Sequence, residues 1–187
     1  MQVETLDART LTPAQATDIA ELLVRVWPNS TKKLADREEQ MLAMGRDYTG
    51  PDTQAPKSFL LRENGKIIAH SAFLPRTIGT TTGDLVIAGL TRVCTDPNQR
   101  GRGLGDIVVK AVFDLVDDGT FPFSLFQTTL EVRPFYEKLG ATIIENPIIN
   151  SLEKQSHVSP FWDKEIMRYP GTGGWPDGVI DLRGPGY

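Results

Sequence analysis

The sequence predicts an α/β fold of the mixed α+β kind, in which a mostly antiparallel sheet carries helices on both faces. Two patterns favour this class: apolar residues recur at helical spacing over residues 104–115, and Asn64-Gly65 separates two apolar, strand-like segments. The predicted elements run in the order helix, helix, three strands, helix, strand, helix, strand and tail. Hairpin-linked strands followed by alternating helices and strands indicate one mixed sheet.

Two helices are expected ahead of the first strand. Thr12 and Pro13 suit the cap and the first turn of a helix, and Gln15 stands where it completes a capping box. A second, more highly charged helix is expected over residues 32–44, with Gly45 near its end.

Three strands are expected next, at residues 58–61, 67–74 and 85–95. Asn64-Gly65 predicts the first connection, because this pair tolerates the positive φ angles of a tight hairpin turn. A second turn is expected at residues 80–84. The third strand runs into Asp96-Pro97, which stands at the start of a glycine-rich loop.

The second half of the chain alternates helices and strands. Apolar spacing predicts a helix over residues 104–115 that stops at Gly119. The later predicted elements are a buried strand at 121–126, a helix at 132–139 ending at Gly140, and strands at 141–145, 165–169 and 179–182. Residues 183–187 are expected to be loosely held.

Length and composition are typical of a single globular domain that spans residues 1–187. The chain is 40% hydrophobic and 24% charged, with a net charge of −4 and a pI of about 5.2. An acidic chain of this kind offers no broad basic face, so nucleic acid is not expected as a partner.

The cysteine and histidine content favours a reduced compartment and predicts no metal site. Cys94 is the only cysteine, so no disulfide can form within the chain, and we interpret it as a small buried residue. His70 and His157 do not have metal-ligand spacing. The N-terminal residues do not resemble a signal peptide, and no apolar run is long enough to cross a bilayer. We therefore expect a cytoplasmic protein without membrane contact.

The loop after the third strand has the composition of an anion-binding site. Gly101, Gly103 and Gly105 stand at alternate positions, so the backbone can turn tightly and direct several N–H groups the same way. Arg100 and Arg102 add positive charge, and the helix that begins next adds its dipole. A pyrophosphate or a similar anion is the predicted ligand.

Two common phosphate-binding loops do not fit this segment. A P-loop requires Lys and then Ser or Thr after its last glycine, whereas Asp106 and Ile107 follow Gly105. A dinucleotide fingerprint requires G-x-G-x-x-G within a parallel βαβ unit, whereas here the spacing is G-x-G-x-G after antiparallel strands.

A third pattern fits better. Arg100-x-x-Gly103-x-Gly105, placed between a strand and a helix, resembles motif A of the GNAT superfamily, the GCN5-related N-acetyltransferases. The match extends upstream over residues 93–97, and the segment 135–141 (Phe-Tyr-Glu-Lys-Leu-Gly-Ala) resembles motif B of the same family. The resemblance implies a single acyl-CoA N-acyltransferase domain with acetyl-CoA as its cosubstrate.

The resemblance also implies which residues hold acetyl-CoA. The N–H groups of residues 100–105 would bind its pyrophosphate, and the strand at 93–95 would pair with the pantetheine arm as with an added strand. The implied cofactor-binding residues are Val93, Cys94, Thr95, Arg100, Gly101, Arg102, Gly103, Leu104 and Gly105.

The implied reaction is direct attack of a primary amine on acetyl-CoA in a ternary complex. The amine must lose a proton, the developing oxyanion needs donors, and the leaving thiolate needs a proton. Tyr136 matches the motif B tyrosine and is the predicted proton donor; the alternative is a tyrosine that packs its helix onto the sheet. Backbone N–H groups at 93–95 are the predicted oxyanion donors.

No residue stands out as the general base. Gly89 occupies the position where some family members have a glutamate, and Glu131 lies too close in sequence to Tyr136. The other candidates are more typical of structural or solvent-facing positions: His70, Glu38 and Glu39. A chain of water molecules is the alternative to a dedicated base.

The acceptor is the least defined part of the prediction. The short segment before Pro134 and a tail with Trp162, Trp175 and Asp177 resemble a GNAT subgroup that includes aminoglycoside 2′-N-acetyltransferases, which hold a polyamine sugar near the C-terminus. Asp177, Asp181 and Trp175 would take that role here; alternatively, the tail covers a sheet edge.

Other acceptors and one non-enzymatic function stay open. A small-molecule or peptide amine is expected as the acceptor, and a homodimer is compatible with the family, in which dimers are common. The second hypothesis is a CoA-binding or sensing module of the same fold that has lost catalysis.

Overall fold

The structure is a computed structural model that describes residues 1–154 and 158–187. It divides into two compact units, of which unit 1 comprises residues 1–74 and 91–112, and unit 2 comprises residues 75–90 and 113–187. The borders fall inside three elements: β3 (Lys66–Thr80), β4 (Gly83–Thr95) and α3 (Leu104–Asp117).

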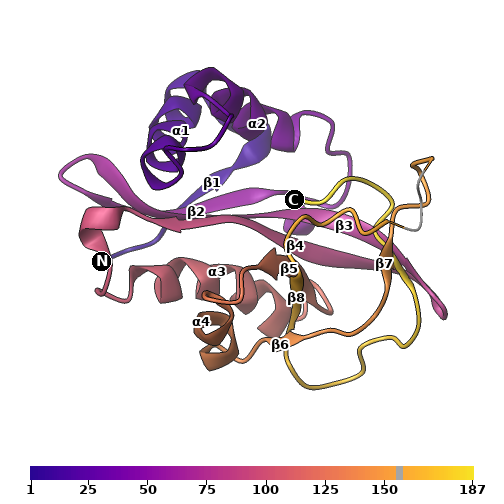
Figure 1. Ribbon diagram of the computed structural model, residues 1–187. Helices are drawn as coiled ribbons and strands as arrows, with labels where there is room; N and C mark the ends of the chain where they lie inside the picture. The colour runs from indigo at the N-terminus through magenta and orange to yellow at the C-terminus, as the bar shows by residue number, and fades with distance from the viewer. Residues whose placement is uncertain (155–157) are drawn as a thin grey trace. The chain divides into compact units, whose positions relative to one another are not determined.

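Unit 1 holds the N-terminal helices and the first strands. Its elements, besides its parts of β3, β4 and α3, are β1 (Glu4–Asp7), α1 (Pro13–Val26), α2 (Leu34–Arg46), β2 (Lys57–Glu63) and short 3₁₀ turns at Ala8–Thr10, Asp52–Gln54 and Pro97–Gln99. β1 pairs antiparallel with β2, and β2 pairs antiparallel with β3. Figure 1 shows α1 and α2 together on one face of β1 and β2, and the start of α3 on the other face.

The strands of unit 1 are covered on both faces because successive side chains point to opposite sides of a sheet. Leu60 and Ile67 pack with α1 and α2, whereas Leu61 and Ile68 pack with the first turns of α3. This arrangement confirms the predicted mixed sheet with helices on both faces.

The predicted cap of α1 is confirmed. The Thr12 hydroxyl accepts the Gln15 N–H (3.3 Å), and the Gln15 side chain accepts the Thr12 N–H (2.9 Å), which completes the capping box. The hairpin turn is also confirmed, since Asn64 and Gly65 have φ angles of 51° and 79°. β1 was not predicted, because four residues pairing only with β2 leave little periodic signal.

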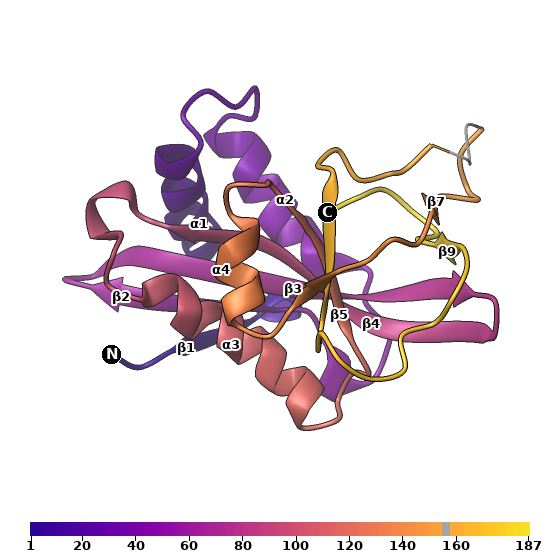
Figure 2. The same cartoon turned by 60° about the horizontal axis from the view of Figure 1, so that its bottom comes forward.

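Unit 2 contains shorter elements. They are β5 (Ser124–Thr128), α4 (Arg133–Lys138), β6 (Thr142–Ile143), β7 (Ile148–Ile149), β8 (Glu165–Tyr169) and β9 (Ile180–Asp181). β4 pairs in parallel with β5 at Ala88 and Gly89, and β5 and β6 each pair antiparallel with β8. β9 pairs antiparallel with β3 and parallel with β7, beside which it lies in Figure 2.

Three expectations about unit 2 require correction. β5 begins at Ser124, three residues later than predicted, and only Thr142–Ile143 of the predicted strand 141–145 pairs. The tail is not loosely held: the Tyr187 hydroxyl donates to the Leu125 carbonyl (3.0 Å), and its ring meets Phe161 edge-on at 5.3 Å. A hydrogen bond and an aromatic contact therefore fix the last residue. In the part of the chain that the structure describes, no helix has the length and hydropathy to span a bilayer.

Candidate active site

The glycine-rich loop begins from a fixed root in unit 1. Asp96 donates its backbone N–H to the Ile68 carbonyl of β3 (2.8 Å), and its side chain accepts the Asn98 N–H (3.0 Å). Arg25 of α1 forms an ion pair with the same carboxylate (3.1 Å). The strand that leads into the loop is thus tied to both β3 and α1.

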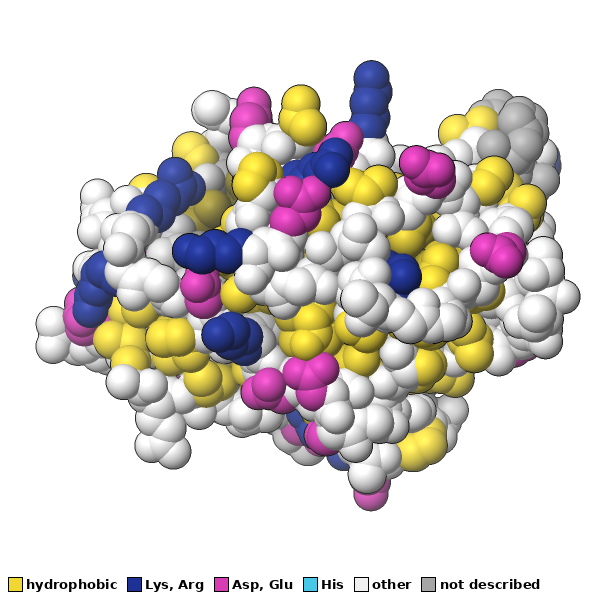
Figure 3. All heavy atoms as spheres, turned by 90° about the horizontal axis from the view of Figure 1, so that it is seen from below, with side chains coloured by type: hydrophobic (Ala, Val, Ile, Leu, Met, Phe, Trp, Pro, Cys, Tyr) yellow, Lys and Arg dark blue, Asp and Glu magenta, His cyan; other side chains and the backbone are white. Residues whose placement is uncertain are grey.

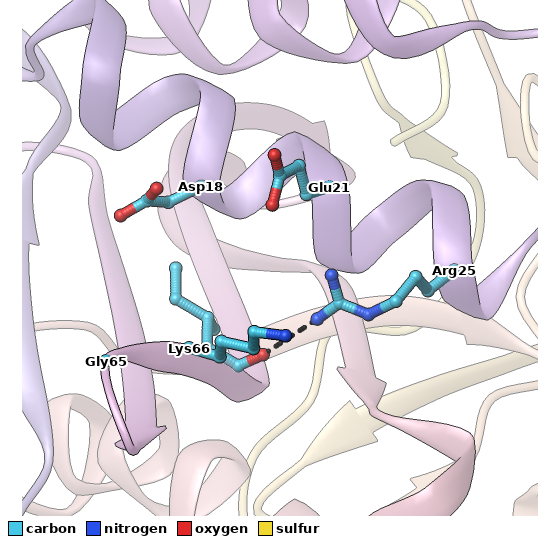
Figure 4. A pocket seen from close by; sticks show the side chains of 6 residues that line it. Asp18, Glu21, Arg25, Gly65 and Lys66 are labelled. Carbon is cyan, nitrogen blue, oxygen red and sulfur yellow. Dashed lines mark hydrogen bonds between the residues drawn. The ribbon is translucent and has the colours of Figure 1, made fainter.

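Figure 4 shows the α1 side of this connection. Arg25 reaches across a small surface pocket to donate to the Ile67 carbonyl (3.0 Å), and Asp18, Glu21 and Lys66 also line the pocket. Asp18 forms an ion pair with Arg62 of β2 (2.9 Å). The bonds made by Arg25 and Asp18 therefore attach α1 to the β2–β3 hairpin.

Beyond this root, the loop offers unbonded backbone donors. Gly101 and Gly103 have φ angles of 79° and 71°, and a Cβ built on either would meet no atom within 4 Å. The two glycines therefore serve the left-handed backbone and not close packing. α3 begins at Leu104, and no acceptor among the described residues bonds the N–H groups of residues 103–105. Such a row of N–H groups at a helix start is an anion-binding arrangement.

The two loop arginines differ in their surroundings. Arg102 pairs with Glu63 of β2 (2.9 Å) and also contacts the Gln99 side chain. Hydrogen bonding to Glu63 raises the pKa of Arg102. Arg100 is exposed and has no ion-pair partner within residues 1–154 and 158–187. Arg100 is therefore the cation that can meet an anion without breaking an existing pair.

Strand β4 is irregular just before the predicted pantetheine-binding residues. Arg92 has a φ of 52°, in the left-handed region that a non-glycine residue rarely adopts. Its carbonyl accepts a hydrogen bond from His70 Nδ1 (2.9 Å), so His70 Nε2 is the acceptor for the Ser58 hydroxyl (3.1 Å). Burial lowers the pKa of His70 to about 4, which keeps the ring neutral at pH 7. The structural interpretation of His70 is confirmed, and we add that it supports Arg92.

Cys94 is buried among α1 and α2 side chains, as its sequence context predicted. Burial raises the pKa of its thiol to about 12. The thiol therefore stays protonated and is a poor nucleophile. The Cys94 side chain faces the core. The groups of residues 93–95 that can bind a ligand are therefore the backbone N–H and C=O groups.

Tyr136 lies in α4 of unit 2 and is buried. Its ring packs against Phe126 of β5 at 4.6 Å and against Phe135 at 4.8 Å between centroids. These contacts fit the packing interpretation. Because the loop belongs to unit 1, a shared site of Tyr136 and the loop stays a prediction.

The position where some relatives have a glutamate is filled by another part of the chain. Gly89 pairs with Leu125, and a Cβ on Gly89 would lie 2.7 Å from Cζ of Tyr187. Gly89 is therefore required for close approach of an aromatic ring, which sequence reasoning missed. Glu131 is exposed in the turn before α4, and Glu39 pairs with Arg46 (2.8 Å), consistent with a solvent-facing helix surface.

The predicted acceptor residues of the tail are occupied by contacts within unit 2. Trp175 donates to the Asn146 side chain (2.8 Å), and the Asp181 carboxylate accepts the N–H groups of Ser151 (3.0 Å) and Arg183 (3.1 Å). These bonds support the alternative in which the tail covers the sheet. The third predicted residue is Asp177, whose carbonyl accepts from Thr81. Trp162, which is part of the resemblance to that subgroup, is exposed.

Charges of both signs are interspersed on the face shown in Figure 3, in line with the balanced composition. Within the described ranges, no group of three or more His, Cys, Asp or Glu side chains is arranged to hold a metal ion. His157 lies outside the described residues.

Comparison with known proteins gives a family and a fold. A family model described as an acetyltransferase (GNAT) domain matches residues 7–144. Among curated proteins, no sequence matches the chain.

Several solved structures share the fold. YhbS of Escherichia coli, a GNAT family N-acetyltransferase in complex with CoA, has a TM-score of 0.62 and 14% identity over 97% of this chain and 88% of that chain. ElaA of E. coli has a TM-score of 0.59 and 16% identity, covering 89% and 97%. A GCN5-related N-acetyltransferase from Kribbella flavida has a TM-score of 0.57 and 18% identity, covering 76% of this chain. This chain spans only 33% of the Kribbella protein.

Proposed function

The chain belongs to the GNAT acetyltransferase family, and from this premise we propose that it transfers an acetyl group from acetyl-CoA to a primary amine of an acceptor molecule. The proposal rests first on the row of unbonded N–H groups at residues 103–105, where α3 begins. A diphosphate carries the charge and the several acceptor oxygens that such a row satisfies. Related YhbS is in complex with CoA, which supports the choice of ligand.

Residues in the loop and in the strand before it suit two parts of CoA, the phosphates and the pantetheine arm. Arg100 supplies an unpaired cation for the phosphates, and the first turn of α3 adds its dipole. Residues 93–95 offer backbone groups that pair with the amide-rich pantetheine arm as an added strand. The left-handed Arg92 disturbs the regular strand directly before them.

Acetyl transfer then needs three kinds of assistance. The amine attacks the thioester carbon, the carbonyl oxygen becomes an oxyanion, and the C–S bond breaks to release a thiolate. Backbone N–H groups at residues 93–95 would stabilise the oxyanion, and the Tyr136 hydroxyl would protonate the thiolate. The amine proton would leave through water, because Gly89 supplies no carboxylate.

Thiol release with a panel of primary amines tests this function. We expect acetyl-CoA-dependent thiol release with at least one amine, and a drop in kcat of about a hundredfold in Tyr136→Phe, because one proton transfer loses its donor. Phe135→Leu is a matched control that alters packing next to Tyr136 but retains the hydroxyl. An equal loss in both variants would assign Tyr136 a packing role only.

Calorimetric titration separates catalysis from simple binding. Heat with CoA but no thiol release with any amine would favour the CoA-binding or sensing module. No heat with either CoA or acetyl-CoA would contradict both forms of the proposal.

A further inference from the structure

Three cations gather in unit 1 outside the glycine-rich loop. Lys32 precedes α2, Arg37 lies in the first turns of that helix, and Arg92 lies in β4. Arg37 and Met44 are seven residues apart and so share one face of α2. Met44 Sδ lies 3.9 Å from Nη1 of Arg92, so this face of the helix lies over Arg92.

Arg37 is held in place by its neighbours, but no carboxylate in the described part of the chain neutralises its charge. Its guanidinium lies over the Trp27 ring at 5.4 Å and donates to the Ser30 hydroxyl (3.1 Å). The residue is 9% exposed, and its Nε is buried with no hydrogen-bond acceptor among the described residues. A buried guanidinium nitrogen without an acceptor is costly.

Neither of the other two cations is compensated. Among the residues that the structure describes, Arg92 donates to Thr91 Oγ1 (3.4 Å) and contacts the Met44 sulfur, and to no other acceptor. Within the described ranges, no carboxylate lies at ion-pair distance from Lys32, Arg37 or Arg92. By contrast, Arg46 on the same helix pairs with Glu39 at 2.8 Å.

Neighbouring positive charge lowers the pKa of Arg92 and of Lys32. Burial, together with the charge of Arg37, lowers the pKa of Arg92 to about 10. Lys32 is exposed, but partial loss of hydration lowers its pKa, with added repulsion from Arg37 and Arg92. Asp36 opposes this effect weakly, and its carboxylate already accepts the Lys33 N–H (2.7 Å).

We infer that Lys32, Arg37 and Arg92 bind an anionic group, a carboxylate or a phosphate, on the acceptor amine. The inference rests on the proposed function, and it names the class of acceptor. Arg92 directly precedes residues 93–95, and strand residues are about 3.3 Å apart, so an anion held there lies within a few bonds of the thioester position. The loop at 100–105 keeps its own role toward CoA. An anionic acceptor also differs from the polycationic sugars of the aminoglycoside subgroup.

Matched acceptors test the inference through thiol release. We compare β-alanine with its amide, and phosphoethanolamine with ethanolamine, at saturating acetyl-CoA. We expect kcat/KM to be about tenfold or more higher for the charged member of at least one pair, since charge-assisted hydrogen bonds are retained only there. The pair that shows the preference identifies carboxylate or phosphate.

Variants tie the preference to these residues. Arg37→Gln and Lys32→Gln are expected to reduce it by about tenfold each through KM, with the KM for acetyl-CoA unchanged. Arg92→Asn removes the cation and retains a residue that tolerates the left-handed backbone. Arg46→Gln is the matched control on α2 and is expected to keep the preference. Lys32 is exposed, so its substitution tests the inference even if an arginine variant fails to fold.

Failure of the inference and failure of the proposed function give different results. Thiol release that is equal for charged and neutral amines overturns the inference and leaves the function standing. If no amine releases thiol, thermal unfolding with inorganic phosphate decides: a stabilisation lost in Arg37→Gln supports an anion site, and its absence in the wild type overturns it.

Discussion

Two segments of this chain begin with Arg-Gly and contain further glycine, but their surroundings differ. They are the loop Arg-Gly-Arg-Gly-Leu-Gly at residues 100–105 and the tail Arg-Gly-Pro-Gly-Tyr at 183–187. In the loop, a Cβ on Gly101 or Gly103 would meet nothing. In the tail, a Cβ on Gly184 would collide with Arg76, and one on Gly186 with the Pro160 carbonyl.

Arg183 and Arg100 show the same contrast, although the other loop arginine, Arg102, is paired with Glu63. Arg183 forms two short hydrogen bonds with Asp84 (2.6 and 2.7 Å), whereas Arg100 has no partner in the described part of the chain. The comparison teaches that glycine serves conformation and access in one segment and close packing in the other. Unsatisfied donors beside empty space indicate a ligand, whereas satisfied donors beside filled space indicate structure.

Tyr187→Ala should break the tail with the largest effect. It removes a ring packed on Gly89 and Phe161 together with the hydrogen bond to Leu125. We expect the free energy of unfolding in urea to fall by about 3 kcal/mol. Calorimetry should show nearly wild-type affinity for CoA in the folded protein. A stable Tyr187→Ala protein that no longer binds CoA would reverse the two roles.

The free energy of unfolding should depend on pH through His70 of β3, which supports the strand before the loop. The pKa of His70 is about 4 in the folded protein and about 6.5 when unfolded. As the pH falls from about 6.5 to 4, the unfolded chain gains a proton that folded His70 does not, so stability falls by on the order of 3 kcal/mol. Urea unfolding across this range measures the slope.

Substitution of His70 provides the control for that slope. His70→Gln is expected to be less stable at pH 7 but to lose most of the dependence between pH 4 and 6.5. A slope that stays the same in His70→Gln would assign it to other groups.

Gly103→Val should weaken CoA binding by the loop with little loss of stability, the opposite of Tyr187→Ala in the tail. The left-handed backbone disfavours valine, so the N–H groups lose their alignment although no protein atom is displaced. We expect at least a tenfold loss of CoA affinity by calorimetry, with a stability cost of only about 1–2 kcal/mol. Gly119→Val, at another left-handed glycine with open space, is the control that should leave affinity intact.

Arg100→Ala and Arg102→Ala should have the smallest effects on CoA affinity and on stability among these variants. Arg100 has no ion pair to lose, so its removal should weaken CoA binding several-fold without changing stability. Arg102 forms a solvent-exposed pair with Glu63, which contributes at most about 1 kcal/mol. If Arg102→Ala affects CoA binding more than Arg100→Ala, the Glu63 pair opens to release Arg102 for the ligand.

Elements with strong local signals were predictable from the sequence. The capping box at Thr12 and the apolar face of α3 depend on neighbours within four residues, so both were located within about two residues. Strands β6 and β9 lie within the predicted strands 141–145 and 179–182, but only two residues of each pair, and β7, also of two residues, was not predicted. The extent of such short strands depends on distant partners, so local periodicity does not reveal it.

The candidate site divides in the same way. The loop was predictable because its glycines and arginines are contiguous. Arg37 and Arg92 were missed because nothing in the sequence separates a buried arginine from an exposed one. The one available signal was the spacing of Arg37, Met41 and Met44, which places them on one face of α2. In the sequence, this spacing resembles a thin apolar stripe beside a solvent-exposed charge.

The two units alternate along the chain, and this order has a consequence for folding during translation. Unit 1 ends at residue 112, whereas unit 2 takes its first residues from positions 75–90 and its last from position 187. A nascent chain that has emerged past residue 112 holds all of the loop, the cation cluster and α2, while the partner strands of the 75–90 segment are still being translated. Unit 1 can therefore fold on the ribosome first, before β5 is available to pair with β4.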